Sequence, residues 1–253
     1  MKWEKNQRKE KKAALDHTQE FKERIIDLGA DLVGIADVEP LKELRLHPPD
    51  LLNSFTRAVS IALRLPRAGF EGISDRPTPL YKSIYQTANQ ILDQIAFRTA
   101  MALQDDGFQG LPIPASQILD HENLYAAISH KAVARMAGLG WQGKNLLLIT
   151  PQFGSRVRLV TVLTNAPLTV DGAIRNRCGD CTACQDACPA QAIKGIKTES
   201  HYKNRNEAMH FSRCVEKVSG NSQLSRKWGC PSVEYVSRYA RLGGQKIHRK
   251  KPD

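Results

Sequence analysis

Apolar residues near the start of the chain first recur at helical spacing and then gather into a short run. Phe21, Ile25 and Leu28 are spaced for one face of a helix, and Gly29 is typical of the residue that follows a helix end. Residues 32–36 are short, apolar and soon followed by a proline, which predicts a buried strand. The chain is therefore expected to open with a helix and then a strand.

The alternation continues through the next two apolar segments. Residues 59–65 alternate apolar with smaller or polar positions and end at a proline, as a strand does. Residues 78–106 keep their apolar positions in helical phase, with Thr78 as a suitable N-cap and Pro79 in the first turn. Residues 107–124 are rich in glycine and proline and predict a connecting loop of the kind that lies beside binding sites.

The last regular part of this region predicts one helix and two strands. Residues 130–137 have a helical pattern, and the apolar runs 146–149 and 157–163 predict a strand hairpin or two neighbours in one sheet. Helices and strands thus alternate over residues 20–170, which favours an α/β layer fold. No internal repeat is visible.

Composition places the chain among ordinary globular proteins. With 253 residues it can bury a core without disulfides, and 41 % of its residues are apolar and 25 % charged. No stretch approaches the roughly 18 uninterrupted apolar residues of a membrane helix. The first dozen residues are charged and lack the apolar stretch of a secretory signal. We expect a soluble, cytoplasmic protein of enzyme size with no membrane partner.

The formal net charge of +11 affects which partners the surface would attract. Much of it lies in basic segments at the two ends, residues 1–19 and 237–253. One interpretation is two solvated, frayed tails, because charge runs are usually disordered. The other is RNA binding, since nucleic acid is the commonest polyanion in the cytosol.

The strongest motif in the chain is a run of cysteines with ferredoxin spacing. Cys178, Cys181, Cys184 and Cys188, followed by Pro189, match C-x2-C-x2-C-x3-C-P. The two-residue gaps let a tight loop aim successive thiolates at one cubane. Structural zinc sites usually come as two separated C-x2-C pairs, and a chain of this length does not need disulfides. The run therefore predicts a [4Fe–4S] cluster that passes electrons.

In two-cluster ferredoxins the fourth cysteine of each run ligates the other cube, so a second run of cysteines would be expected further along the chain. Only Cys214 and Cys230 follow, and the latter precedes a proline as the last cysteine of a run should. Three residues stand where the earlier thiolates would be needed: Gly220, Gln223 and Arg226. We expect one complete cube, its fourth ligand being Cys230 or, as the competing assignment, Cys188. The remaining cysteines, Cys214 among them, are spare thiols or a partial second site.

Residues 128–164, followed by the cysteine run, resemble the epoxyqueuosine reductase family. The hallmark is Ala137-Gly-Leu-Gly-Trp141 followed by Gly143-Lys-Asn145 and a strand, and residues 29–38 resemble the family's N-terminal strand. Together these segments span most of residues 20–235. The chain is shorter than the best-studied members and lacks their second cysteine run.

The resemblance implies a cobalamin-binding α/β domain followed by a small ferredoxin-like domain. In this family, as in the related reductive dehalogenases, electrons pass from iron–sulfur clusters to cobalt, which here would reduce an epoxide on a modified tRNA base. A flavodoxin or ferredoxin would donate the electrons. We expect the α/β corrinoid-binding-like domain at residues 20–170 and the ferredoxin-like domain at 171–236, between the basic tails.

The hallmark segment supplies the candidate corrinoid contacts: Gly138, Gly140, Trp141, Gly143 and Lys144. Its glycines would let backbone approach a large flat ligand, and the lysine could meet a phosphate or propionamide oxygen. The structural alternative is a glycine-rich helix exit with a core tryptophan.

The candidate catalytic residues lie just before the hallmark segment. No counterpart is found to the aspartate-containing segment that supplies the family's proton donor, so Asp120, His121 and His130 are the candidates. His130 could donate a proton or contact the corrinoid, and a satisfied structural histidine is the alternative.

Two functions therefore stay open. One is a cytosolic cobalamin-dependent reductase. The other is a non-catalytic iron–sulfur electron-transfer or RNA-binding protein that kept the fold, and only the first requires a bound corrinoid.

Overall fold

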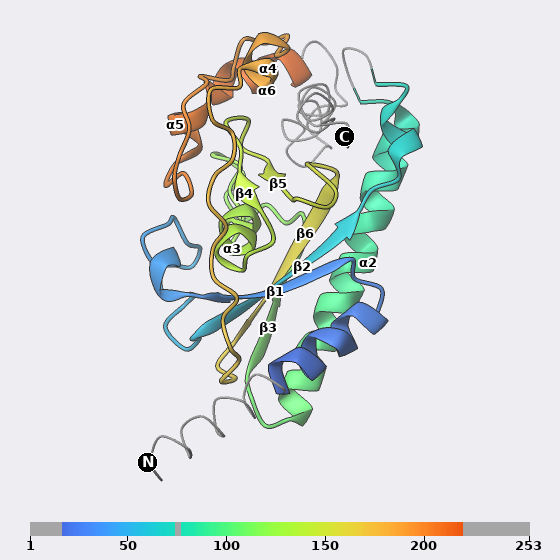
Figure 1. Ribbon diagram of the computed structural model, residues 1–253, viewed down its shortest axis with the longest axis vertical. Coiled ribbons are helices and arrows are strands. Elements are labelled where there is room, and N and C mark those ends of the chain that lie inside the picture. The colour runs from blue at the N-terminus through green and yellow to red at the C-terminus, as the bar shows by residue number, and fades with distance from the viewer. Residues whose placement is uncertain (1–16, 74–76, 220–253) are drawn as a thin grey trace, which may run out of the picture.

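A four-stranded antiparallel sheet in the order β1-β2-β6-β3 forms the centre of the molecule (Figure 1). The computed structural model describes residues 17–73 and 77–219. The strands of this sheet are β1 (Leu32–Asp37), β2 (Arg57–Arg64), β3 (Gly110–Ile113) and β6 (Val157–Thr164). The strands predicted at 32–36 and 59–65 are thus confirmed to within a residue or two at their ends.

The two central strands, β2 and β6, pair along their whole length, from Arg57 opposite Thr164 to Arg64 opposite Val157. Both are buried at most of their positions because helices cover both faces of the sheet. Ile61 faces one helical layer and Ala62 the other, so successive residues enter different cores.

One face of the sheet is covered by α2 (Pro79–Asp105) and by the helix that runs through residues 17–27 (Figure 1). Leu92 and Ile95 of α2 pack into the same core as Ile61 of β2. Thr78 caps α2, its Oγ1 accepting a hydrogen bond from the backbone N–H of Tyr81 at 3.1 Å. The predicted helix and its cap are confirmed.

The other face is covered by α3 (His130–Met136), which begins at its N-cap Ser129. Val133 packs with Ala58 and Leu163 of the sheet. The molecule therefore has helix, sheet and helix layers, and the predicted mixed α/β class is confirmed.

Two of the predicted details are wrong. The segment 107–124 is not a loop throughout, since β3 lies within it and pairs with β6. The runs 146–149 and 157–163 are not partners either: β5 (Leu148–Ile149) pairs with β4 (Trp141–Gln142) in a separate two-stranded sheet, while β6 joins the main sheet. The choice of partner depends on tertiary packing, which hydrophobic periodicity does not encode.

After residue 170 the chain first runs along the layered part, where Asp171 is hydrogen-bonded to Ile35 of β1, and then forms a small, mostly irregular lobe at one end of the sheet (Figure 1). Its helices are α4 (Ala183–Asp186), α5 (Arg205–Ala208) and α6 (Phe211–Ser219). Its core includes Ile193 and Met209 together with Leu146 and Leu147 from the turn between β4 and β5. The β4–β5 turn therefore docks the small lobe onto the layered part of the molecule.

Two short 3-10 helices complete the described secondary structure, η1 (Glu39–Leu41) and η2 (Arg67–Phe70). Within residues 17–73 and 77–219, no helix combines the length and apolar character needed to cross a bilayer. Most of both predicted basic tails, and Cys230, lie outside the described residues.

Candidate functional site

Cys178 and Cys181 lie on a turn that leads into α4, and Cys184 lies in α4 itself. The backbone N–H of Cys181 donates to the carbonyl of Cys178 at 3.1 Å, and that of Cys178 donates to Asn176 Oδ1 at 2.8 Å. Burial, reinforced by Cys178 and Cys181, raises the pKa of the Cys184 thiol to about 11. Cysteine thiolates at this spacing are the usual ligands of iron–sulfur clusters.

Cys188 and Cys214 have different surroundings. Both are buried in the small-lobe core, and Cys188 Sγ accepts a hydrogen bond from the N–H of Ala192 at 3.4 Å. Among the described residues, no three Cys, His, Asp or Glu side chains are already arranged around one metal position. With Cys230 outside those residues, the choice of Cys188 or Cys230 as the fourth ligand stays a prediction.

The hallmark segment is hydrogen-bonded to the cysteine segment. Lys144 is only 6 % exposed, and its Nζ donates to the carbonyl of Cys181 at 3.0 Å. The carbonyl of Gln142 accepts from Asn176 Nδ2 at 2.9 Å, and its side-chain oxygen accepts from the N–H of Tyr202 at 3.0 Å. Lys144 therefore contacts the turn that carries Cys178 and Cys181. The contact of Lys144 with a corrinoid, which the sequence predicts, stays a prediction.

The hallmark glycines approach other parts of the protein closely. A Cβ on Gly140 would lie 2.2 Å from the carbonyl oxygen of Ile149, and one on Gly138 would lie 2.7 Å from that of Gly172. Gly138 also has a φ of +74°, which favours glycine. A Cβ on Gly143 would meet the Ile149 side chain at 2.6 Å. Backbone packing alone thus requires glycine at 138 and 140, whereas at 143 only side chains would have to shift. Contact of these glycines with a corrinoid stays a prediction.

Trp141 of the same segment is partly buried, and the guanidinium of Arg177 lies 5.7 Å from its ring centre. Its Nε1 is buried and has no acceptor among the described residues. An indole N–H in this condition usually finds a partner, so a bound ligand could supply one.

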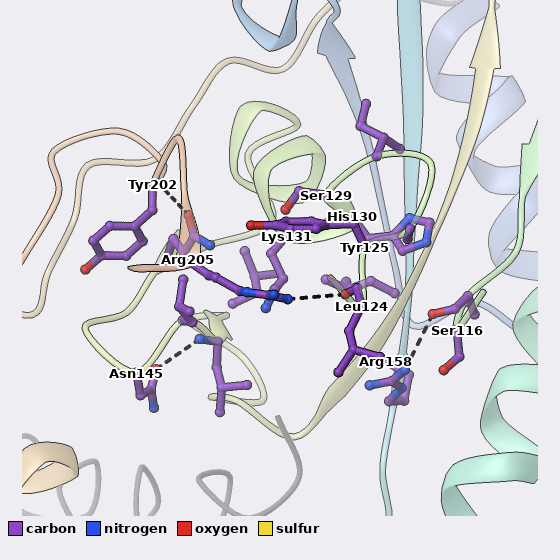
Figure 2. A pocket seen from close by; sticks show the side chains of 18 of the residues that line it. Ser116, Leu124, Tyr125, Ser129, His130, Lys131, Asn145, Arg158, Tyr202 and Arg205 are labelled. Carbon is purple, nitrogen blue, oxygen red and sulfur yellow. Dashed lines mark hydrogen bonds between the residues drawn. The ribbon is translucent and has the colours of Figure 1, made fainter. Parts of the chain in front are cut away.

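A pocket of about 270 Å³ opens beside the hallmark segment, between α3, β6, the β4–β5 turn and the small lobe (Figure 2). Gln142 and Asn145 border it directly. Aromatic side chains from α2 and from two segments outside the helices and strands also line it, namely Tyr85, Tyr125 and Tyr202. The volume is near the lower end for small-molecule sites, so this pocket would enclose only part of a corrinoid.

His130 lines this pocket, but both of its ring nitrogens are occupied. Nε2 lies 3.0 Å from the carbonyl of Pro114, which can only accept, so Nε2 carries the proton. Nδ1 then accepts from the hydroxyl of Thr161 at 2.8 Å. Burial lowers the pKa of His130 to about 4, so the ring is neutral at pH 7. His130 therefore has the features of a structural histidine whose hydrogen bonds are satisfied within the protein.

Asp120 and His121 lie on a turn, and neither is among the described residues that line the pocket. The N–H of Asn123 donates to Asp120 at 2.9 Å, and Arg45 forms an ion pair with it at 2.5 Å. The hydrogen bond from Asn123 and, to a lesser degree, Arg45 lower the pKa of the carboxyl. His121 is exposed. The three candidate catalytic residues are thus not brought together.

Comparison with curated proteins relates most of the chain to one group of enzymes. No protein-family model matches it. The epoxyqueuosine reductase of Listeria monocytogenes is 30 % identical over 178 residues, covering 69 % of this chain and 46 % of the relative. That of Vibrio cholerae is 29 % identical over 268 residues, covering 91 % of this chain and 70 % of the relative. That of Bacillus anthracis is 48 % identical over 66 residues, covering 26 % and 17 %. The chain belongs to the epoxyqueuosine reductase-like family.

Solved structures share the fold of this family member. An epoxyqueuosine reductase from Streptococcus thermophilus aligns with a TM-score of 0.55 at 21 % identity, covering 88 % of this chain and 66 % of that one. A catabolic reductive dehalogenase aligns with a TM-score of 0.58 at 19 % identity, covering 86 % and 34 %. The chain spans only 17 % to 46 % of the first curated relatives that it matches.

Two arginines of the pocket were not predicted from the sequence. Arg158 extends from β6, donates from Nη2 to the Tyr85 hydroxyl at 2.9 Å and stacks 4.1 Å from that ring centre. Arg205 extends from α5 and stacks on the rings of Tyr125 and Phe211, at 4.3 and 3.4 Å. For Arg158 a signal exists, since it is a charged residue inside the apolar run 157–164.

Proposed function

We propose that this chain is an iron–sulfur reductase of the epoxyqueuosine reductase type, in which a [4Fe–4S] cluster passes electrons to a corrinoid. One observation carries the proposal: the segment that borders the pocket is the segment that holds the cysteine turn. Lys144 donates to the carbonyl of Cys181, and two residues away Gln142 both accepts from Asn176 and lines the pocket. A cluster on the turn and a ligand in the pocket would therefore be close neighbours.

The residues of this chain would bind the cluster, stabilise its negative charge and exclude water from it. Cys178, Cys181 and Cys184 would hold three irons of the cube. The buried ammonium of Lys144 would favour the negative charge of the thiolates and of the added electron. The apolar small-lobe core, which includes Leu146 and Leu147, would keep water from one side of the cluster. A corrinoid, when bound, supplies a cobalt centre that can take up the electrons and pass them to a substrate.

The proposed substrate is a tRNA-borne epoxide. The curated relatives are named epoxyqueuosine reductases, and one fold neighbour, with a TM-score of 0.55, was solved with a modified tRNA stem loop. A net charge of +11 would draw an RNA partner electrostatically. A cytoplasmic flavodoxin or ferredoxin is the proposed electron donor.

Opening of an epoxide also needs a proton, and two of the predicted donors are poorly suited to give it. His130 is neutral and uses its only N–H on a backbone carbonyl, while Asp120 has a lowered pKa and is ionised at pH 7. The remaining candidate, His121, is exposed and outside the pocket lining. The proton would therefore come from another group of the pocket or from water.

A second function is favoured by the cysteine pattern. Residues 220, 223 and 226 lack the thiolates of a second cube, which removes one step of a two-cluster electron path. A non-catalytic iron–sulfur electron carrier or RNA-binding protein would need neither that step nor a corrinoid.

Corrinoid binding separates the two functions. The full chain would be purified without oxygen, reconstituted with iron and sulfide, and mixed with cob(II)alamin before gel filtration and electron paramagnetic resonance. We expect cobalamin to co-elute with altered cobalt hyperfine structure, also in a Cys181→Ser control that lacks the cluster. Free elution of cobalamin beside an intact cluster would exclude the reductase.

A further inference from the structure

The pocket has an excess of positive charge. Its described lining contains five Lys and Arg side chains and no carboxylate. Two of the five are neutralised at the rim: Arg45 pairs with Asp120 at 2.5 Å, and Lys203 pairs with Glu43 at 2.7 Å. The three inner cations are Arg158 of β6, Lys131 of α3 and Arg205 of α5.

Arg158 is the clearest of these inner cations. It is partly buried, and its hydrogen-bond acceptors are all neutral: Asn89 Oδ1 at 3.0 Å, the Tyr85 hydroxyl at 2.9 Å and the carbonyl of Ala115 at 3.5 Å. Among the described residues no carboxylate lies within 4.0 Å of its guanidinium, and Nη1 has no acceptor. Arg158 is thus held in place while part of its donor set stays available.

A fixed guanidinium without a counter-charge is well suited to bind an oxyanion. A partly buried cation is costly unless paired, and the planar fork of arginine matches carboxylate and phosphate oxygens in two parallel hydrogen bonds. Because Asn89 and Tyr85 already fix the side chain, little rotamer entropy remains to be lost on binding. In Figure 2 the Arg158 guanidinium lies beside Ser116, and Arg205 reaches toward Leu124 from the other side.

The shape of the pocket limits what the anion can be attached to. A volume of about 270 Å³ admits a ligand of about one ring. Apolar side chains, including Leu124, Ile128 and Leu159, line it beside these cations and would contact the apolar part of such a ligand. We propose that this pocket binds a small, ring-bearing oxyanion, a carboxylate or a phosphate ester, through Arg158. That such an anion is a substrate rests on the proposed function, whereas its binding to Arg158 does not.

Anion binding would be measured on the full chain purified without oxygen. Benzoate and inorganic phosphate, as the probes, would be titrated by ligand-observed NMR and calorimetry. We expect saturable binding of one equivalent, weakened about tenfold to a hundredfold by Arg158→Gln. The control Arg24→Gln removes the same charge from an exposed residue paired with Asp106 and should bind as the wild type does.

A milder variant keeps the test informative if Arg158→Gln does not fold. Tyr85→Phe retains the ring and removes only the hydroxyl that fixes Arg158, and we expect it to weaken benzoate severalfold. Absence of saturable binding to wild type, or equal binding by Arg158→Gln, would overturn the proposal.

Further outcomes distinguish the source of the anion and the fate of the proposed function. A tRNA stem loop that binds through Arg158 while benzoate and phosphate do not would overturn the proposal in favour of an RNA phosphate. Cobalamin carries a phosphate that cobinamide lacks. If wild type does not bind benzoate, and Arg158→Gln loses binding of cobalamin but keeps that of cobinamide, the proposal is overturned and Arg158 binds the corrinoid's own phosphate. If benzoate binds but cobalamin does not, the anion site stands and the reductase fails.

Discussion

Replacement of Gly140 by alanine tests what the hallmark glycines are for. The new Cβ would lie 2.2 Å from the carbonyl oxygen of Ile149, 2.8 Å from its carbonyl carbon and 3.1 Å from Cα of Thr150. All three are backbone atoms of β5 and the turn that follows, so no side-chain rotation relieves the clash. The pairing of Trp141 with Ile149 would have to open.

The magnitude follows from the depth of this overlap. Inserting a methyl group into a packed site costs about 1 to 3 kcal/mol, and a clash with backbone lies at the upper end. For a domain of this size roughly 3 kcal/mol lowers Tm by roughly 6 to 12 °C. The loss should occur in protein without any cofactor, because the clash is entirely within the protein.

Thermal melts followed by circular dichroism would measure this effect on cofactor-free protein. Gly72→Ala is the matched control, since the nearest atom to its Cβ is Thr78 Cγ2 at 3.6 Å, and it should melt close to wild type. If Gly140→Ala melts as the wild type does but fails to bind cobalamin, the glycine serves the ligand and the packing interpretation is refuted.

Three further predictions concern single side chains. Lys144→Met removes a buried positive charge and its hydrogen bond to the Cys181 carbonyl, so the midpoint potential of a reconstituted cluster should fall. An EPR-monitored redox titration would measure this, and an unchanged potential would count against a contact between Lys144 and the cluster turn. Cys181→Ser should abolish the visible absorption of the cluster but leave the Tm of the cofactor-free chain unchanged, because Cys181 is exposed; a large drop in Tm would contradict this. His130 has a folded pKa of about 4, below its usual 6.5, so the unfolded state takes up a proton first and stability is lost as pH falls from 7 toward 4. His130→Gln should flatten the fall in Tm between pH 7 and 5, and a parallel fall would argue against the neutral ring.

Local patterns in the sequence predict those elements whose residues carry their own signals. The cap at Thr78 and the apolar phase of α2 are both local, and both are confirmed. The strand β3 was missed because Gly110 and Pro112 are typical of loops, yet β3 lies at the edge of the sheet, where proline is tolerated. Gly110 is also required, since a Cβ there would lie 2.7 Å from the carbonyl of Ala100.

The candidate site shows the same division between local and tertiary information. Spacing alone predicts the cysteine turn, because the donors to one cube are close in sequence. The contact between Lys144 and Cys181 joins residues 37 apart, and Arg158 meets Tyr85 across 73 positions. Neither contact leaves a periodic pattern in the chain, so both emerge only from the fold.

The most direct test of the proposed electron path is magnetic coupling between the two centres. The reconstituted chain with bound cob(II)alamin would be poised so that both the cluster and the cobalt are paramagnetic, and its EPR spectrum would be compared with that of Cys181→Ser. We predict that reducing the cluster broadens or splits the cobalt signal in wild type alone, since the turn that carries Cys178 and Cys181 is hydrogen-bonded to the segment that borders the pocket. A cobalt signal indifferent to the state of the cluster would contradict the account.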